Sequence, residues 1–511
     1  MAYPLTERSN MDSLAFNTLS AVDARRLIAS RQLSPVELLE ACIERMHAVN
    51  PAVNALAATC FDRARDEARA AEQAVMRGEP LGLLHGLPLG VKDLEETAGL
   101  LTTYGSPIFR TNVPSHDNAM VARLRAAGAI VTAKTNTPEM GAGANTRNAV
   151  WGATGNPFDP TLTAGGSSGG SAVALATDML PLCTGTDLGG SLRIPAALCG
   201  VVGFRPSPGL VPGDTRVLGW SPLSVSGPMA RNVADLRLQL AAMVGLHGTE
   251  PLGVDCDYRT ILRAREVDLS TLRIGYTEDF GVCDVSNAVR QTFRAKVSAL
   301  SRYVRACEPV KFELGEADRC FDVMRAQNFI ASYREIYERD PNLLGPNTRT
   351  NYEMGQTMSM ADAVWAQAEQ TRIFRRFQAK FDDYDLILSP TCSTFPFPWE
   401  QLYLAEMDGR PLENYYRWLG LTYVVTLLTN PALSLPSGTN DAGMPFGLQL
   451  IGPFRGDRRL LDIAQALEAA VSQDNSLRRP VPDLGKLAGA EAALKSIVTD
   501  PPEEAAAQGS R

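Results

Sequence analysis

Apolar and polar positions along this chain follow two periods, and short apolar runs of strand length alternate with longer segments of helical periodicity. The clearest helix start is at Ser34, where Ser-Pro-Val-Glu supplies an N-cap serine, a proline in the first turn and a glutamate three residues later. From there to about Val49 the apolar residues return every three or four positions. This pattern predicts an amphipathic helix that packs against a core.

The same reading assigns the remaining elements. Strands are predicted at 54–58, 88–92, 129–133, 181–185, 273–276, 385–391, 432–435 and 447–451. Further helices are predicted at 62–78, 117–127, 171–179, 233–245, 287–303, 317–338, 360–381 and 459–471. Because strands alternate with helices and no repeat or clear linker interrupts them, the fold class is α/β with a mostly parallel or mixed central sheet.

Composition narrows the class of protein. The 511 residues are 45% hydrophobic and 21% charged, with a formal net charge of −8 and no long basic run, which argues against nucleic acid as the main partner. No apolar run is long enough for a membrane span, and the first residues show no secretory signal pattern. The nine cysteines are odd in number and widely spaced. We therefore expect free thiols, a cytoplasmic location and no membrane partner.

The candidate chemistry lies in residues 164–195. Two glycine-rich turns that carry serine, Gly165-Gly-Ser-Ser-Gly-Gly and Gly185-Thr-Asp-Leu-Gly-Gly-Ser-Leu-Arg-Ile-Pro, flank one short apolar element. Glycine is costly in conformational entropy, so such turns indicate backbone shapes that side chains would forbid. Upstream, Lys92 ends a short apolar strand in the sequence Pro88-Leu-Gly-Val-Lys-Asp.

These motifs resemble those of the amidase signature hydrolases. Ser167 and Ser191 are 24 residues apart, as is common in that family, and Lys92 stands in its Gly-x-Lys-Asp setting. Weaker resemblance runs from about Leu19 to Leu467. It implies one large amidase signature domain (19–483, signature core about 85–230). Outside it, residues 1–18 are expected to form a loose N-terminal arm, and the Ala- and Glu-rich residues 484–511 a flexible C-terminal tail. The implied fold is a mixed, twisted central sheet covered by helices on both faces.

The resemblance also implies a mechanism. Lys92, Ser167 and Ser191 would form the family's Ser–cis-Ser–Lys triad, with the cis peptide bond between Gly166 and Ser167. Neutral Lys92 would take a proton from Ser167, which would take one from Ser191, and Ser191 would form an acyl-enzyme. Thr186, Asp187 and Arg193 match motif positions and are expected to support the loop, and Ser168 and Ser171 to hydrogen-bond behind it.

The residues themselves leave other hydrolase types open. Gly165-Gly-Ser-Ser-Gly169 matches the nucleophile elbow of α/β-hydrolases, but of the four histidines only His247 follows it, in a polar stretch. The histidines have no paired spacing that would suggest zinc, and no metal site is expected. Lysine is then the remaining base, and burial beside Leu87, Leu89 and Val91 would depress its pKa. The alternative is a surface lysine paired with Asp93 or Glu95.

The second glycine-rich turn could also stabilise negative charge through its backbone. Consecutive backbone N–H groups of Leu188, Gly189, Gly190 and Ser191 can converge on the negative oxygen of a tetrahedral intermediate. Side chains at positions 189 and 190 would block that approach. The alternative is an ordinary Gly-Gly turn.

The sequence gives weaker evidence about the residues that form the substrate pocket. Relatives bring the backbone corresponding to Met140, Gly141 and Ala142 toward the substrate. The loop 206–222, which holds Arg216 and Trp220, is mainly apolar and is predicted to cover the site. Other aromatic candidates for the pocket are Trp151, Phe395, Phe397, Trp399 and Tyr403. This composition favours an uncharged, partly aromatic substrate, with Arg216 as an alternative carboxylate anchor.

The leading interpretation is a cofactor-free amidase that cleaves amide, anilide or carbamate bonds, similar to stand-alone aryl acylamidases and urethanases. The alternative is the glutamine-hydrolysing A subunit of a tRNA-dependent amidotransferase, which shares the same core. A non-catalytic binding protein is a third reading, against which the intact Lys92, Ser167 and Ser191 speak. The expected partner is a small-molecule substrate, and a homodimer is the assembly to test.

Overall fold

The computed structural model describes residues 13–503 and shows how local sequence sets the first elements. Helix α2 (Pro35–Val53) begins where the sequence predicts, with the Ser34 hydroxyl accepting from Val36 N and the Glu37 carboxylate accepting from Ser34 N at 3.0 Å each. Its predicted apolar face is buried. The helix continues one turn beyond Val49 and carries Pro51 inside its last turn.

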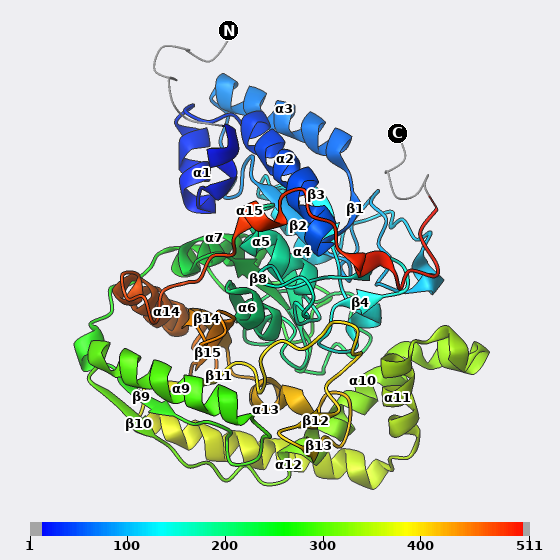
Figure 1. The fold of residues 1–511 in the computed structure, drawn as a ribbon, viewed down its shortest axis with the longest axis vertical. Helices are drawn as coiled ribbons and strands as arrows, with labels where there is room; N and C mark the ends of the chain where they lie inside the picture. Colours follow the sequence, from blue (N-terminus) through cyan, green and yellow to red (C-terminus); the bar gives the residue numbers. More distant parts are fainter. Residues whose placement is uncertain (1–12, 504–511) are drawn as a thin grey trace.

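One mixed sheet of eleven strands organises the molecule (Figure 1), in the order β1-β3-β2-β6-β8-β7-β14-β15-β11-β9-β10. The strands are β1 (Leu56–Thr59), β2 (Pro88–Lys92), β3 (Ile130–Thr135), β6 (Leu182–Asp187), β7 (Val202–Arg205), β8 (Val225–Ala230), β9 (Arg273–Tyr276), β10 (Ala306–Pro309), β11 (Leu386–Pro390), β14 (Ala432–Thr439) and β15 (Pro445–Ile451). Strand β2 is parallel to both β3 and β6, whereas the strands from β6 to β11 along this order pair antiparallel. The predicted α/β class with a mixed sheet is confirmed.

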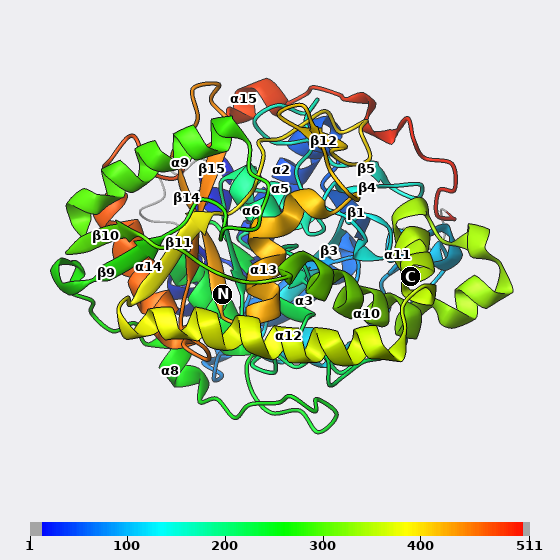
Figure 2. The same ribbon diagram turned by 90° about the horizontal axis from the view of Figure 1, so that it is seen from below.

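Helices flank this sheet (Figures 1 and 2). The helices of eight or more residues are α1 (Ala21–Ala29), α2, α3 (Phe61–Arg77), α4 (Ala119–Ala126), α5 (Gly169–Ala176), α7 (Val233–Met243), α9 (Asn287–Leu300), α10 (Ala317–Arg339), α11 (Pro346–Gln356), α12 (Met360–Gln378), α13 (Gly420–Leu428) and α14 (Asp457–Val471). Helices α10, α12 and α13 pack on one another, and α11 packs on α10. Of this group, α10 lines the same cavity as the serine-bearing turns, and α13 packs against the second of these turns.

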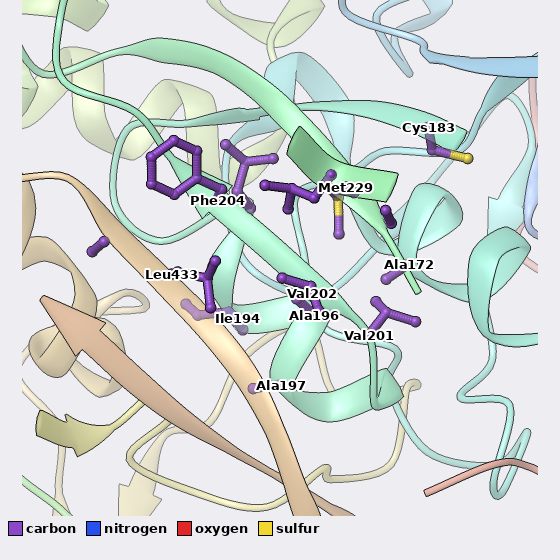
Figure 3. Packing of buried hydrophobic residues seen from close by; sticks show 14 of the residues in the cluster. Ala172, Cys183, Ile194, Ala196, Ala197, Val201, Val202, Phe204, Met229 and Leu433 are labelled. Atoms are coloured by element: carbon purple, nitrogen blue, oxygen red, sulfur yellow. The ribbon is translucent and has the colours of Figure 1, made fainter. Parts of the chain in front are cut away.

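A short buried helix, α6 (Arg193–Cys199), follows the second glycine-rich turn and fixes it to the sheet. Figure 3 shows Ile194, Ala196 and Ala197 of α6 beside Val202 and Phe204 of β7 and Leu433 of β14. All of these side chains are at most 2% exposed. The turn therefore rests on a close-packed part of the core, where small changes in volume are felt.

The two chain ends differ from expectation. Residues 13–18, expected as part of an arm, form a 3₁₀ helix that packs against α2, and residues 1–12 lie outside the described part of the chain. Residues 484–503, expected as a flexible tail, lie against the domain: Leu487 and Leu494 are buried, and Gly489 N donates to Ala48 O at 3.1 Å. Isolated leucines in a polar segment carry no periodic signal, which is why the docking was missed. The domain limits at 19 and 483 stay a prediction.

Candidate active site

Lys92 lies at the end of β2 with its amine enclosed by three hydroxyl groups. Its Nζ is 2.7 Å from Ser167 Oγ, 2.9 Å from Ser168 Oγ and 2.8 Å from Thr186 Oγ1. The side chain is fully buried, so the alternative of a surface lysine is wrong. A neutral amine has two N–H bonds and one lone pair, and three hydroxyls suffice to satisfy all of them.

Burial lowers the pKa of Lys92 to about 7, against the opposing effect of the negative charges of Glu95 and Asp187. Leu87, Leu89 and Val91, the expected apolar walls, are fully buried. An amine with this pKa is substantially neutral at neutral pH and can accept a proton.

The first glycine-rich turn presents Ser167 to this amine. The peptide bond between Gly166 and Ser167 is cis, as the family resemblance implied. Helix α5 begins directly afterwards at Gly169, where a β-carbon would lie only 2.3 Å from Thr146 Oγ1. Ser168 and Thr186 were expected to act behind the loop, yet both contact Nζ directly. The position of Thr186 could have been predicted from the strand pattern. Residues two apart in a strand lie on the same face, and Thr184, two residues before Thr186, accepts a hydrogen bond from Lys92 N at 3.0 Å.

The second glycine-rich turn follows β6 and carries Ser191, which is half-buried and lines a cavity. Gly190 N donates to Asp187 Oδ1 at 2.9 Å, so it is not available to a substrate oxygen and the expectation of four donors is corrected to three. Within residues 13–503, the N–H groups of Leu188, Gly189 and Ser191 have no acceptor, and the Ser191 hydroxyl has no hydrogen bond. These are the groups through which the turn can act on a bound molecule.

A steric constraint requires glycine at position 190. Its φ is +124°, and a β-carbon there would lie 2.2 Å from Thr422 Oγ1. The Thr422 hydroxyl donates to Gly189 O at 2.6 Å. Glycine at 190 is thus required by the backbone shape and by the close approach of α13, rather than by clearance for an oxyanion.

A buried ion cluster holds the turn from behind. The carboxylate of Asp187 accepts from Arg193 at 2.8 and 2.9 Å and from Leu192 N at 3.2 Å, and Arg205 lies 3.3 Å away. Burial alone would raise the pKa of Asp187, but the charges of Arg193 and Arg205 bring it below its usual value. The support expected of Asp187 and Arg193 is therefore present as a charge-assisted network.

A cavity of about 450 Å³ opens in front of the two turns. Ser167, Thr186, Leu188, Gly189 and Ser191 belong to its lining. The rest of the lining is mainly apolar and comes from distant segments, among them Leu94, Tyr104, Phe109, Val217, Phe329 and Ile336. Among its lining residues there is no aspartate or glutamate.

Some of the predicted pocket residues line this cavity and others do not. Met140, Gly141 and Arg216 line it, and a β-carbon at Gly141 would lie 3.4 Å from Ser167 Oγ. Ala142 instead faces a separate cavity beside α11, and Trp220 is 77% exposed on the surface, so the assignment of these two to the pocket is corrected. The other aromatic candidates, Trp151, Phe395, Phe397, Trp399 and Tyr403, also lie outside the lining. Trp399 is covered by Leu494 of the C-terminal segment.

Arg216 is committed to its own loop. Its Nε donates to Gly213 O, its Nη1 to the carbonyls of Ser221 and Ser224, and its Nη2 to both oxygens of Glu250 at 2.6 Å. All five N–H bonds of a guanidinium are used in this arrangement. Arg216 therefore fixes the loop 206–222 over the cavity and has no donor left for a substrate carboxylate.

Residues 13–503 contain neither a cluster of metal ligands nor a helix that could span a membrane. No group of three or more histidine, cysteine, aspartate or glutamate side chains is arranged to hold a metal ion. None of the helices described is both long enough and apolar enough to traverse a bilayer.

Comparison with known proteins places this geometry in context. The family model described as Amidase matches residues 37–461. An acylamidase of Rhodococcus erythropolis is 33% identical over 459 residues, covering 88% of this chain and 95% of the relative. The A subunit of the glutamyl-tRNA(Gln) amidotransferase of Acidothermus cellulolyticus is 34% identical over 496 residues, covering 91% and 97%. The structure of a bacterial aryl acylamidase of the amidase signature enzymes superposes with a TM-score of 0.84 at 25% identity, covering 93% of this chain and 99% of that one.

Proposed function

The chain belongs to the amidase signature family and is a hydrolase of carbon–nitrogen bonds, and from that premise we propose that it acts alone on amides, anilides and carbamates through an acyl-enzyme on Ser191. The observation that carries the proposal is the buried Lys92 amine, 2.7 Å from Ser167 Oγ, beside the cavity that Ser191 lines. Histidine has no part in this arrangement, because none of the four lines the cavity.

In the proposed reaction the neutral Lys92 amine accepts the Ser167 hydroxyl proton while Ser167 accepts that of Ser191. The Ser191 oxygen attacks the carbonyl carbon, and the N–H groups of Leu188, Gly189 and Ser191 stabilise the oxyanion. The proton returns through Ser167 to the leaving nitrogen as the C–N bond breaks. Water then attacks the acyl-enzyme, gives its proton to the same relay and releases the acid.

We further propose a preference for aryl or hydrophobic substrates over glutamine. Free glutamine is a zwitterion, and the cavity that Ser167 and Ser191 line has no carboxylate in its lining for the ammonium group, since Glu95 and Glu96 line an adjoining cavity instead. The apolar side chains opposite the serines suit an aromatic or aliphatic body instead. Carbamates and urethanes present the same carbonyl group to Ser191 and are included in the proposal.

The second candidate is the glutamine-hydrolysing A subunit of a tRNA-dependent amidotransferase, which the 34% identity to such a protein favours. Kinetics of the purified chain with a 4-nitroanilide, an aryl carbamate and glutamine separate the two candidates. We expect turnover of the aryl substrates without any added protein. A glutaminase rate well above both aryl rates, or activity only with partner subunits, would support the second candidate instead.

The proposed setting is the cytoplasm, where the nine cysteines, all free in the structure, would stay reduced. A homodimer is the assembly we propose to test, with no nucleic acid or membrane partner. Sedimentation of the purified chain at several concentrations would decide this, because a single species at the mass of one 55.1 kDa chain contradicts the dimer.

A further inference from the structure

The cavity contains a buried cation that the reaction described above does not use. Arg325 lies on α10, lines the cavity near the second glycine-rich turn and is only 5% exposed. Burying a charged group in a mainly apolar site is costly unless an opposite charge compensates it. The question is therefore whether the contacts of Arg325 include a compensating negative charge.

The partners found for this guanidinium are neutral. Its Nε donates to Asn351 Oδ1 at 2.9 Å, and its Nη2 donates to the Tyr415 hydroxyl at 2.8 Å. Four aromatic rings surround it at 4.8 to 5.9 Å from the guanidinium carbon: Phe321, Phe329, Tyr415 and Tyr416. These contacts hold the group in one orientation, but they supply no negative charge.

Every other buried arginine in the described part of the chain is paired with a negatively charged carboxylate. Six arginines in residues 13–503 are buried, and five of them form ion pairs with a carboxylate. The five pairs are Arg193 and Arg205 with Asp187, Arg231 with Asp178, Arg237 with Asp462, and Arg417 with Asp322. Arg325 is the sixth, and no described carboxylate lies within ion-pair distance of it.

The Nη1 atom of Arg325 faces the second glycine-rich turn, the nucleophile turn that carries Ser191. Its Nη1 has no hydrogen-bond partner within residues 13–503 and is accessible from the cavity. A β-carbon at Gly189 would lie 4.0 Å from this nitrogen. A donor with two free N–H bonds is thus held beside the turn where a substrate carbonyl would bind.

We propose that Arg325 selects substrates that carry a carboxylate on an otherwise apolar acyl or aryl group, with Nη1 binding that carboxylate. The inference rests on the proposed amidase function and refines the expectation of an uncharged substrate. A carboxylate would complete the ion pair that Arg325 lacks, and a charge-assisted bond is stronger than a neutral one. Glutamine remains a poor fit because its ammonium group still has no partner in the lining.

Matched substrate pairs test the proposal. For the acyl side, the mono-4-nitroanilides of glutaric and adipic acid are compared with the 4-nitroanilides of valeric and hexanoic acid. For the leaving side, 4-acetamidobenzoate is compared with 4-methylacetanilide. In at least one pair the wild-type enzyme should favour the anion by about 10- to 100-fold in kcat/KM, the range for a hydrogen bond to a charged group.

Arg325→Gln should reduce this preference to near one, mainly by slowing the anionic substrate, and Arg325→Lys should restore part of it. The preference is a ratio within one protein sample, so partial unfolding of a variant does not alter it. Arg334→Gln is the matched control, since Arg334 lies on the same helix with its side chain 64% exposed and should keep the wild-type ratio.

Equal kcat/KM for both members of every pair in the wild type, or an unchanged preference in Arg325→Gln, would overturn the role of Arg325 and show that its aromatic surroundings suffice. Hydrolysis of the neutral anilides in that case would leave the proposed function intact. Failure of the wild type to hydrolyse any of these amides would contradict the proposed function itself.

Discussion

The two serine-bearing turns and the wall of the cavity, which is formed mainly by α10 and the loop 206–222, are built in different ways. The turns lie within residues 164–195 and carry much of their support there, in the Asp187 cluster behind Ser191 and the cis bond before Ser167, while Lys92 and Thr422 contact them from elsewhere in the chain. The wall draws on segments far apart in sequence, among them α10 and the loop 206–222. Both serines of the proposed relay thus come from one local motif with Lys92 as their partner, whereas substrate selection depends on how distant elements pack.

The largest effect should come from the turn side. Ser191→Ala removes the only serine hydroxyl of the second glycine-rich turn (residues 185–195), which lines the cavity, so kcat for a 4-nitroanilide should fall by at least about 10⁴-fold. Circular dichroism and thermal melting should show a folded protein. Ser298→Ala, an exposed serine on α9, serves as the control with wild-type activity. If Ser191→Ala kept a substantial fraction of the wild-type rate, Ser191 would not be the nucleophile.

Lys92 should give the next largest effect, and its signature is a pH profile. Because the amine must be neutral and its pKa is about 7, kcat/KM should rise with pH through an acid limb near that value. Lys92→Met should lower activity by about 10²- to 10⁴-fold and flatten the limb. An acid limb with the same midpoint in Lys92→Met would assign the titration to another group.

Substitutions that loosen the cavity wall should change the kinetics less than those at Ser191 or Lys92. Glu250 binds Arg216 through both carboxylate oxygens and is 1% exposed, so Glu250→Gln weakens the clamp on the loop 206–222. We expect KM to rise about 3- to 10-fold with little change in kcat, since the loop covers the substrate and does not touch the relay. A loss confined to kcat would place this loop with the turns rather than with the wall.

The smallest effect is expected at Trp220. Its side chain is 77% exposed and lies outside the lining, so Trp220→Ala should change kcat/KM by less than about twofold. Steady-state kinetics on the same 4-nitroanilide are sufficient. A tenfold loss would mean that the loop closes over bound substrate and carries Trp220 into the cavity.

The contrast between the two sides also explains what the sequence could predict. Strand β2 was placed correctly at both ends because Pro88 and Lys92 bound a short apolar run, and the turns were recognisable from local glycine and serine. Helix α13 was missed because all nine of its residues are buried, which removes the polar positions that reveal helical periodicity. Strand β8 was missed because Gly227 and Pro228 lie within it.

The pocket assignments failed for a related reason. Trp220 and Trp399 were chosen because aromatic side chains often line pockets, but composition does not show which face of a loop a side chain occupies. Arg325 shows no local signal at all, since an arginine in a helix is usually a solvated residue. Only the packing of α10, α11 and the segment around Tyr415 makes it a buried cation beside the cavity.

The central claim is that Ser191 carries the acyl group, and trapping that intermediate tests it most directly. An N-aryl carbamate ester would be mixed with the wild-type enzyme, quenched in acid during turnover and digested for peptide mass spectrometry, with Ser191→Ala treated identically. Because the arylamine leaves, we predict an alkoxycarbonyl group on Ser191 in the wild type and no adduct in Ser191→Ala. An alkoxycarbonyl group on Ser167 or on another residue, or turnover without any covalent adduct, would contradict the account.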